Sequence, residues 1–219
     1  TTIAVAPSDA RVLYAGTDDG YVWVTDDRGT TWRNVSAGLP HRWVTRLAVH
    51  PSDPSTAYVT FSGLKWRDAQ PHVFRTDDRG ATWRNVSEGL PDAPVNALVL
   101  DPAHPDTLYV GSDVGIFASL DGGRAWQAVG EGLPAVSVYD LNIHPSGRSL
   151  VAGTHGRSMY RLDLPSATAR EATPPARPAA RLEAPFPNPF SAAVTLRYDL
   201  PAPGHVRLDV YDVLGRRLH

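Results

Sequence analysis

The sequence predicts an all-β protein built from β-propeller blades, and three observations support this prediction. Short runs of β-branched and aromatic residues alternate with Gly, Pro, Asp and Ser throughout residues 1–164. No part of this stretch shows the 3.6-residue apolar period of an amphipathic helix. Sequence markers recur together roughly every 45 residues, and four short strands per copy at such a period are typical of propeller blades.

The clearest marker is an octet that ends in tryptophan. It spans Thr25–Trp32 in the first copy, Thr76–Trp83 in the second and Ser119–Trp126 in the third. The three tryptophans are 51 and 43 residues apart. A segment ending in Gly-Leu-Pro follows each octet, and an apolar run ending in proline opens each copy. The prolines of those opening runs are Pro7, Pro51, Pro102 and Pro145.

Within the first copy we expect four strands in chain order. Ile3–Ala6 ends at a Pro-Ser-Asp turn, and Val12–Ala15 ends at the polar segment Gly16–Gly20. Tyr21–Val24 leads into the octet, and Thr31–Val35 forms the last strand.

The fourth copy is shorter than the others. Leu150–Thr154 and Ser158–Leu164 align with strands two and three of a blade, and no octet follows them. Propellers close by pairing strands from both chain ends, which protects an edge that would otherwise stay open. We therefore expect residues 1–164 to be four consecutive blades, the last one incomplete, that end a larger ring. The alternative is a self-contained ring of four blades.

The octets resemble the Asp box of BNR-repeat propellers, a superfamily that includes sialidase-, xyloglucanase- and sortilin-like propellers. The resemblance covers residues 1–164, although Ala125 stands where threonine is usual, so one side-chain hydrogen bond should be missing there. We expect the aspartates to accept N–H bonds across a tight turn, the glycines to supply positive φ, and the tryptophans to pack against neighbouring sheets. These structural residues are Asp27, Gly29, Trp32, Asp78, Gly80, Trp83, Asp121, Gly123 and Trp126.

Any ligand is expected on the blade face that carries the turns between strands two and three and the links between blades. The longer second copy adds residues to this face within Phe61–His72. Charges flank Trp66 there, as suits a sugar or peptide platform; the alternative is that Trp66 packs onto its own blade. The candidate ligand-binding residues are Asp18, Asp19, Trp43, Trp66, Arg67, Asp113, His155 and Arg157.

Composition disfavours several other functions. The chain has 21 basic and 23 acidic residues and a formal charge of −2, which argues against nucleic-acid binding. No apolar run is long enough to span a bilayer, and without cysteine there is neither a disulfide nor a thiolate ligand. We predict no metal, no cofactor and no catalytic residue in this segment, because nothing in the sequence brings two carboxylates within the range that glycoside hydrolysis needs.

The remaining residues divide into a linker and a tail. Residues 165–185 are mostly Pro, Ala, Arg, Glu and Thr, a composition that predicts a semi-rigid spacer. Apolar and polar residues then alternate in Val194–Leu200 and in Val206–Val210, which predicts a half-buried hairpin.

Residues 186–219 resemble the start of the C-terminal sorting domain of type IX secretion substrates, a small Ig-like sandwich. The segments that carry the resemblance are Pro187–Phe190 and Val210–Arg216. It implies a bacterial protein that the secretion machinery exports to the medium or the cell surface. The alternative is an ordinary appended Ig-like module.

Three functions fit these observations. The first is a secreted or cell-surface scaffold that binds a polysaccharide or a protein on the blade face, with no catalysis in this segment. The second is the final blades of a glycoside hydrolase whose catalytic residues lie mainly upstream. The third is a sortilin-like propeller that binds peptides.

Overall fold

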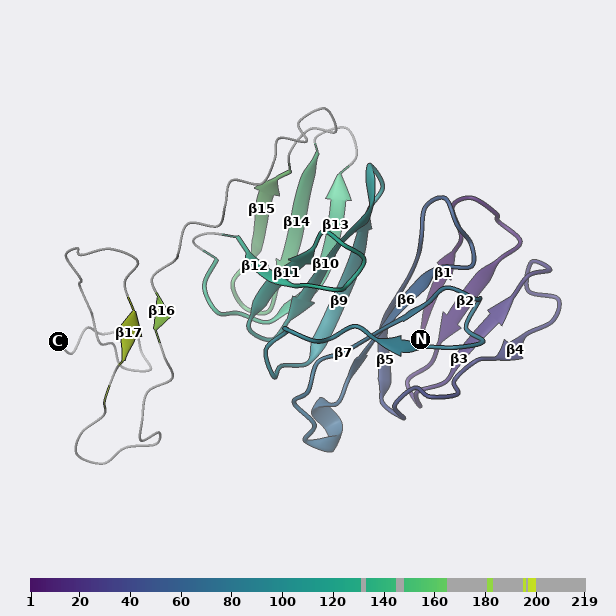
Figure 1. The fold of residues 1–219 in the computed structure, drawn as a ribbon, viewed down its shortest axis with the longest axis horizontal. Coiled ribbons are helices and arrows are strands. Elements are labelled where there is room, and N and C mark those ends of the chain that lie inside the picture. Colours follow the sequence, from purple (N-terminus) through teal and green to yellow (C-terminus); the bar gives the residue numbers. More distant parts are fainter. Residues whose placement is uncertain (131–132, 145–147, 165–180, 183–194, 196, 200–219) are drawn as a thin grey trace. The chain divides into compact units, whose positions relative to one another are not determined.

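The computed structural model describes residues 1–130, 133–144, 148–164, 181–182, 195 and 197–199. It divides the chain into two compact units, Thr1–Ala169 and Arg170–His219. The described strands of the first unit form antiparallel sheets that follow one another in chain order (Figure 1). The predicted all-β class with four-stranded repeats is confirmed.

Each sheet is made of consecutive strands. The first contains β1 (Thr2–Val5), β2 (Leu13–Gly16), β3 (Val22–Thr25) and β4 (Arg33–Asn34). The second contains β5 (Trp43–Val49), β6 (Ala57–Ser62), β7 (His72–Thr76) and β8 (Arg84–Asn85), with a 3₁₀ turn, η1 (Leu64–Trp66), between β6 and β7. The third contains β9 (Val95–Asp101), β10 (His104–Ser112), β11 (Gly115–Ser119) and β12 (Gln127–Val129). The fourth contains β13 (Val138–His144), β14 (Ser149–Thr154) and β15 (Met159–Asp163).

The hydrophobic core lies between consecutive sheets. The first strands are neighbours in series, β1 beside β5, β5 beside β9 and β9 beside β13. Three apolar layers result, one for each pair of adjacent sheets. In the first layer Tyr14 and Val44 are buried together with Phe61. The second and third sheets each contribute side chains to two of these layers, and the first and fourth to one, so the sheets depend on one another for their stability.

The octet turns form a compact hydrogen-bond pattern. Asp78 Oδ1 accepts a bond from the Thr82 backbone N–H at 2.8 Å, and Asp78 Oδ2 accepts one from the Thr82 hydroxyl at 2.6 Å. Asp27 likewise accepts bonds from the backbone N–H and the hydroxyl of Thr31. These two bonds, the one from the N–H first, lower the pKa of Asp27 to about 2. The glycines of the turns all have positive φ: 89° at Gly29, 78° at Gly80 and 91° at Gly123.

The third octet lacks one of these bonds. Asp121 Oδ1 accepts the Ala125 backbone N–H at 3.0 Å, but alanine has no hydroxyl to donate to the second carboxylate oxygen.

The octet tryptophans join neighbouring sheets. The Trp83 indole N–H donates to the Val35 carbonyl of the first sheet at 2.7 Å. The Trp126 indole N–H donates to the Val86 carbonyl of the second sheet at 2.8 Å. Trp32 instead donates to Gly29 of its own turn and is 39% exposed. The second and third octets therefore each fix their own sheet to the one before it.

A buried ion pair joins the third and fourth sheets. Asp101, whose side chain is 2% exposed, accepts bonds from both terminal nitrogens of Arg148 at 2.6 and 2.9 Å. His104 Nδ1 lies 3.0 Å from the same carboxylate. Burial by itself raises the pKa of Asp101, but the bonds from Arg148 and His104 outweigh it and lower that pKa to about 2. The pair therefore stays charged well below neutral pH.

The second unit contains one described pairing. β16 (Arg181–Leu182) lies antiparallel to β17 (Tyr198–Asp199). Arg181 and Leu182 lie within residues 165–185, and the assignment of that stretch as a spacer stays a prediction. The expected partner strand, Val206–Val210, and the rest of the expected sorting domain fall almost wholly outside the described residues.

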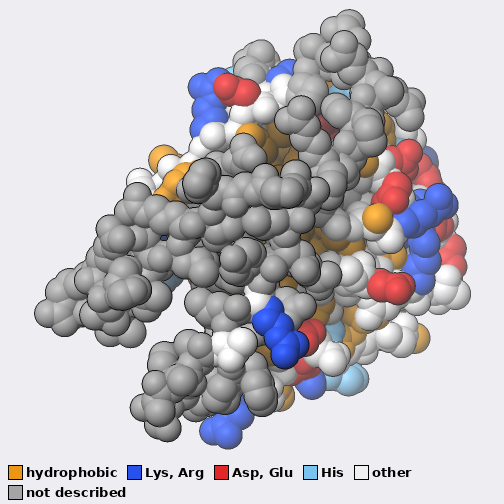
Figure 2. All heavy atoms as spheres, turned by 60° about the vertical axis from the view of Figure 1, so that its left-hand side comes forward, with side chains coloured by type: hydrophobic (Ala, Val, Ile, Leu, Met, Phe, Trp, Pro, Cys, Tyr) orange, Lys and Arg blue, Asp and Glu red, His pale blue; other side chains and the backbone are white. Residues whose placement is uncertain are grey.

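The described surface carries mixed charge. Figure 2 shows basic and acidic side chains side by side on the face in view, with hydrophobic side chains between them. Within the described ranges, no helix has the length and apolar character needed to cross a bilayer.

The third octet offers a direct test of the turn. Ala125→Thr is expected to raise the free energy of unfolding by about 0.5–1.5 kcal/mol, because the new hydroxyl can donate to Asp121 as Thr82 does to Asp78. Urea unfolding measures the change. Ala125→Val, which has the same shape but no hydroxyl, is the control. An equal gain from both variants would show that strand propensity, and not the hydrogen bond, is responsible.

Candidate functional site

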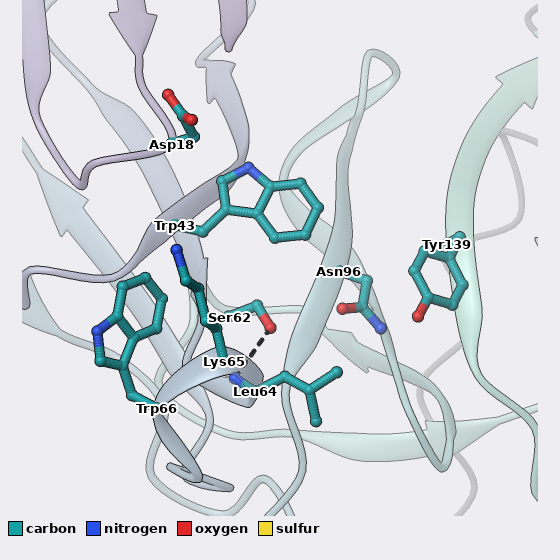
Figure 3. A pocket seen from close by; sticks show the side chains of 8 residues that line it. All are labelled: Asp18, Trp43, Ser62, Leu64, Lys65, Trp66, Asn96 and Tyr139. Carbon is teal, nitrogen blue, oxygen red and sulfur yellow. Dashed lines mark hydrogen bonds between the residues drawn. The ribbon is translucent and has the colours of Figure 1, made fainter.

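A pocket of about 380 Å³ lies on the first unit, at the ends of strands from all four sheets. Figure 3 shows the lining side chains, with Trp43 between the η1 side, which carries Trp66 and Lys65, and the side that carries Asn96 and Tyr139. They come from the turn after β2, the beginnings of β5, β9 and β13, the end of β6, and the connection between β6 and β7. The lining residues are Asp18, Trp43, Ser62, Leu64, Lys65, Trp66, Asn96 and Tyr139.

Two tryptophans flank this space. Trp43, the first residue of β5, is 46% exposed, and Trp66, the last residue of η1, is 41% exposed. Arg42 lies over the Trp66 ring at 5.4 Å from its centroid, and Lys65 lies at 5.5 Å. Large aromatic rings are mostly buried, so two half-exposed indoles on one pocket offer apolar surface to a ligand, and both cations lie beside Trp66.

An acidic residue holds the connection that carries Trp66. Asp68 Oδ2 accepts a bond from Arg42 Nε at 3.1 Å and lies 2.9 Å from His72 Nε2. The bond from His72, ahead of the one from Arg42, lowers the pKa of Asp68. Asp68 lies in the connection between β6 and β7, and His72 is the first residue of β7. Arg42 lies in the link between the first two sheets. Asp68 therefore anchors η1 at two points of the scaffold.

The opposite wall of the pocket is more polar. The Asn96 side chain donates to Asp113 Oδ1 at 2.9 Å, so Asp113 orients an amide that lines the pocket. The Tyr139 ring lies 5.8 Å from the His155 ring, between centroids. The Ser62 hydroxyl accepts a bond from the Leu64 backbone N–H at 3.4 Å, which the dashed line in Figure 3 marks.

The structure brings some of the predicted ligand-binding residues together and leaves others apart. Asp18, Trp43 and Trp66 line one pocket. Asp113 and His155 stand behind lining residues, as partners of Asn96 and Tyr139. The remaining three predicted residues do not line the pocket; they are Asp19, Arg67 and Arg157. Ligand binding by any of the eight residues stays a prediction.

Asn96 and Tyr139 belong to the pocket but escaped the sequence analysis. A signal for them exists in the repeat, since each lies six residues before a marker proline, Pro102 and Pro145. Thr45 occupies the same place before Pro51, and its hydroxyl donates to the Val95 carbonyl at 2.8 Å. Alignment of the copies therefore identifies the position, six residues before the marker proline, at which the first strand of a sheet lies near the pocket.

The described residues offer no metal site, since no group of three or more His, Cys, Asp or Glu is placed to hold an ion. Asp18 is the one carboxylate among the lining residues of the pocket.

Comparison with known proteins places the chain near several propellers. No family model matches it. It is 29% identical over 129 residues to a probable oligoxyloglucan-reducing end-specific xyloglucanase of Neosartorya fischeri, which covers 51% of this chain and 15% of that protein. It is 32% identical over 83 residues to vacuolar protein sorting/targeting protein 10 of Laccaria bicolor, or 38% of this chain and 5% of that protein. The chain thus spans a small part of the curated relatives that it matches.

Solved structures show the same fold. The GH74 xyloglucanase from Xanthomonas campestris superposes with a TM-score of 0.58 at 24% identity, covering 74% of this chain and 29% of that one. The β-propeller domain of Cps50 from Myceliophteria thermophila gives a TM-score of 0.60 at 17% identity, covering 79% of this chain and 55% of that one. At such identities the likeness shows a β-propeller architecture.

The anchoring role of Asp68 predicts a local effect. Asp68→Ala is expected to speed tryptic cleavage after Lys65 and Arg67 about tenfold, because local opening becomes easier when bonds to Arg42 and His72 are lost. Mass spectrometry of timed digests measures the rate. Gln70→Ala, a nearby exposed change, should leave the rate unaltered. Cleavage of Asp68→Ala at the original rate would contradict the anchor.

Proposed function

We propose that this chain is a β-propeller segment that binds polysaccharide in the pocket between Trp43 and Trp66. The observation that carries the proposal is the pair of half-exposed indoles on one pocket. A sugar ring presents apolar C–H faces that pack on aromatic rings, and hydroxyl edges that bond polar groups. Asp18 and Asn96 supply such polar groups on the same pocket.

The size of the pocket favours a saccharide over a protein surface. Its volume of about 380 Å³ lies within the range of roughly 300–1,000 Å³ that small-molecule sites occupy. A chain of sugars can place one or two units in such a space while the rest runs along the surface. The similarity to proteins named as xyloglucanases also supports a saccharide ligand.

A second candidate is that the whole protein hydrolyses a glycan. The xyloglucanase relatives favour it. Glycoside hydrolysis uses two carboxylates about 5–10 Å apart, whereas the pocket has only Asp18 among its lining residues. This candidate therefore requires catalytic residues in parts of the protein beyond this segment. Reducing ends released from xyloglucan by the full-length protein, and not by this segment, would support it.

We further propose that the protein is bacterial and acts in the medium or at the cell surface. The segments Pro187–Phe190 and Val210–Arg216, with their resemblance to a sorting domain, support export through residues 186–219 by the secretion machinery.

Loss of either indole should weaken binding. Trp43→Ala and Trp66→Ala are each expected to reduce affinity for xyloglucan oligosaccharides about tenfold, because a lost contact of roughly 60 Å² is worth about 1.5 kcal/mol. Titration calorimetry measures the affinity, and circular dichroism checks the fold.

Trp32→Ala is the matched control, since Trp32 is also exposed but belongs to an octet turn outside the pocket. Equal losses for all three variants would indicate a non-specific effect. If the Trp43 and Trp66 variants bind like the unaltered chain, the pocket is not the glycan site.

The export proposal has its own measurement. A fluorescent protein fused to the full C-terminal region of the parent protein should appear outside cells that possess type IX secretion, and removal of residues 186–219 from the fusion should abolish that export. Unchanged export after the deletion would contradict the assignment.

A further inference from the structure

Lys65 is the one cation among the residues that line the pocket. Within the described part of the chain, no carboxylate forms a salt bridge with it, whereas neighbouring Arg42 is paired with Asp68. Its contact with the Trp66 ring, at 5.5 Å from the centroid, is the interaction that the structure gives its ammonium group. In Figure 3 the Lys65 side chain rises between the two indoles. Among the described residues, this positive charge of the pocket has no carboxylate within salt-bridge distance.

The backbone around Lys65 is fixed. The Trp66 N–H donates to the Gly63 carbonyl at 2.8 Å, and the Arg67 N–H donates to the Leu64 carbonyl at 3.1 Å. A Cβ at Gly63 would lie 2.5 Å from the Asp68 carbonyl oxygen, so the chain doubles back tightly at this point. Together with the bonds of Asp68, these contacts hold the base of the lysine side chain in place. Its charge is thus presented to the pocket by a rigid turn.

A ligand that covers the indoles must also cover this ammonium group. Burying a charge is costly unless the ligand supplies a partner of opposite sign. A neutral sugar would displace water from the Lys65 ammonium group and would offer it only hydroxyl groups as hydrogen-bond acceptors. A sugar with a carboxylate would form a charge-assisted hydrogen bond there, while its ring packs on Trp66.

The single carboxylate of the pocket, Asp18, lies on the side away from η1 in Figure 3. It repels an anionic group and accepts hydrogen bonds from hydroxyls. The two charges therefore orient an acidic sugar, with its carboxylate toward Lys65 and its hydroxyls toward Asp18.

We propose that the pocket takes a uronic-acid unit of an acidic polysaccharide, with the sugar carboxylate bound by Lys65 between Trp43 and Trp66. The proposal rests on the proposed function, because it names the class of glycan that this site prefers.

The test compares the same polysaccharide chain with free and with esterified carboxylates. Oligogalacturonides and their methyl esters are titrated against the chain at low salt. The acid form is expected to bind about tenfold more tightly than the ester, and Lys65→Gln is expected to make the two affinities equal. Lys65→Arg should retain the preference. Added salt should reduce it.

Arg28→Gln is the matched control, since it removes one positive charge from an exposed octet turn outside the pocket. It should keep the full preference for the acid form. Loss of the preference in Arg28→Gln as well would show that net charge, and not Lys65, attracts the ligand, and this would overturn the proposal.

Other outcomes separate this inference from the proposed function. If xyloglucan binds in a manner that depends on Trp43 and Trp66, but acid and ester bind equally, the glycan site stands and the preference for uronic acid is wrong. If neither xyloglucan nor either galacturonide binds, both proposals are wrong. If the acid form binds preferentially and Lys65→Gln does not alter that preference, the assignment to Lys65 is wrong.

Discussion

The joint between neighbouring sheets is the constraint on which the rest of this structure depends. In the second and third octets an aspartate closes the turn, and the tryptophan that follows donates its indole N–H to the residue directly after the last strand of the preceding sheet. The turn glycines approach the same strand so closely that a Cβ at Gly80 would lie 2.7 Å from Val35. One turn thus supplies a directional bond and a close steric fit. Because the same joint recurs, consecutive sheets meet in a similar way, and their first strands lie side by side.

The candidate site follows from that arrangement. Trp43, Asn96 and Tyr139 each stand at or next to the beginning of the first strand of a different sheet, so no single sheet could form the pocket. Further contacts between first strands keep these positions together: the Thr45 hydroxyl donates to Val95 of the next sheet, and Arg46 forms an ion pair with Asp140. Among the described residues, every buried side-chain nitrogen and oxygen has a hydrogen-bond partner, as a rigid scaffold requires. The insertion that contains η1 then adds Trp66 and Lys65, which the repeating scaffold alone does not provide.

The comparisons define the architecture more closely than the function. Proteins named for xyloglucan hydrolysis and for vacuolar sorting both resemble this chain, over 15% and 5% of their own lengths. Similar propellers occur in proteins named for different activities, so the fold does not identify the function of this chain. The residues of the pocket have to identify it. Among the described residues, the pocket is lined by a pair of indoles, one carboxylate and one ammonium group, a set suited to binding a sugar, whereas glycoside hydrolysis uses two carboxylates.

The strands, the octet turns and the face that carries the pocket can be predicted from the sequence. These features depend on contacts within a few residues, such as Asp27 with Thr31, or on the alternation of turns along a repeat. Asp18, Trp43 and Trp66 were found in this way. Three further relations come from the packing of the sheets: Asn96 and Tyr139 join this pocket, Trp83 bonds Val35, and Arg42 is paired with Asp68. These relations link residues that are far apart in the chain, from 26 positions for Arg42 and Asp68 to 121 for Asp18 and Tyr139, and the packing angle between sheets sets them. No local pattern encodes that angle.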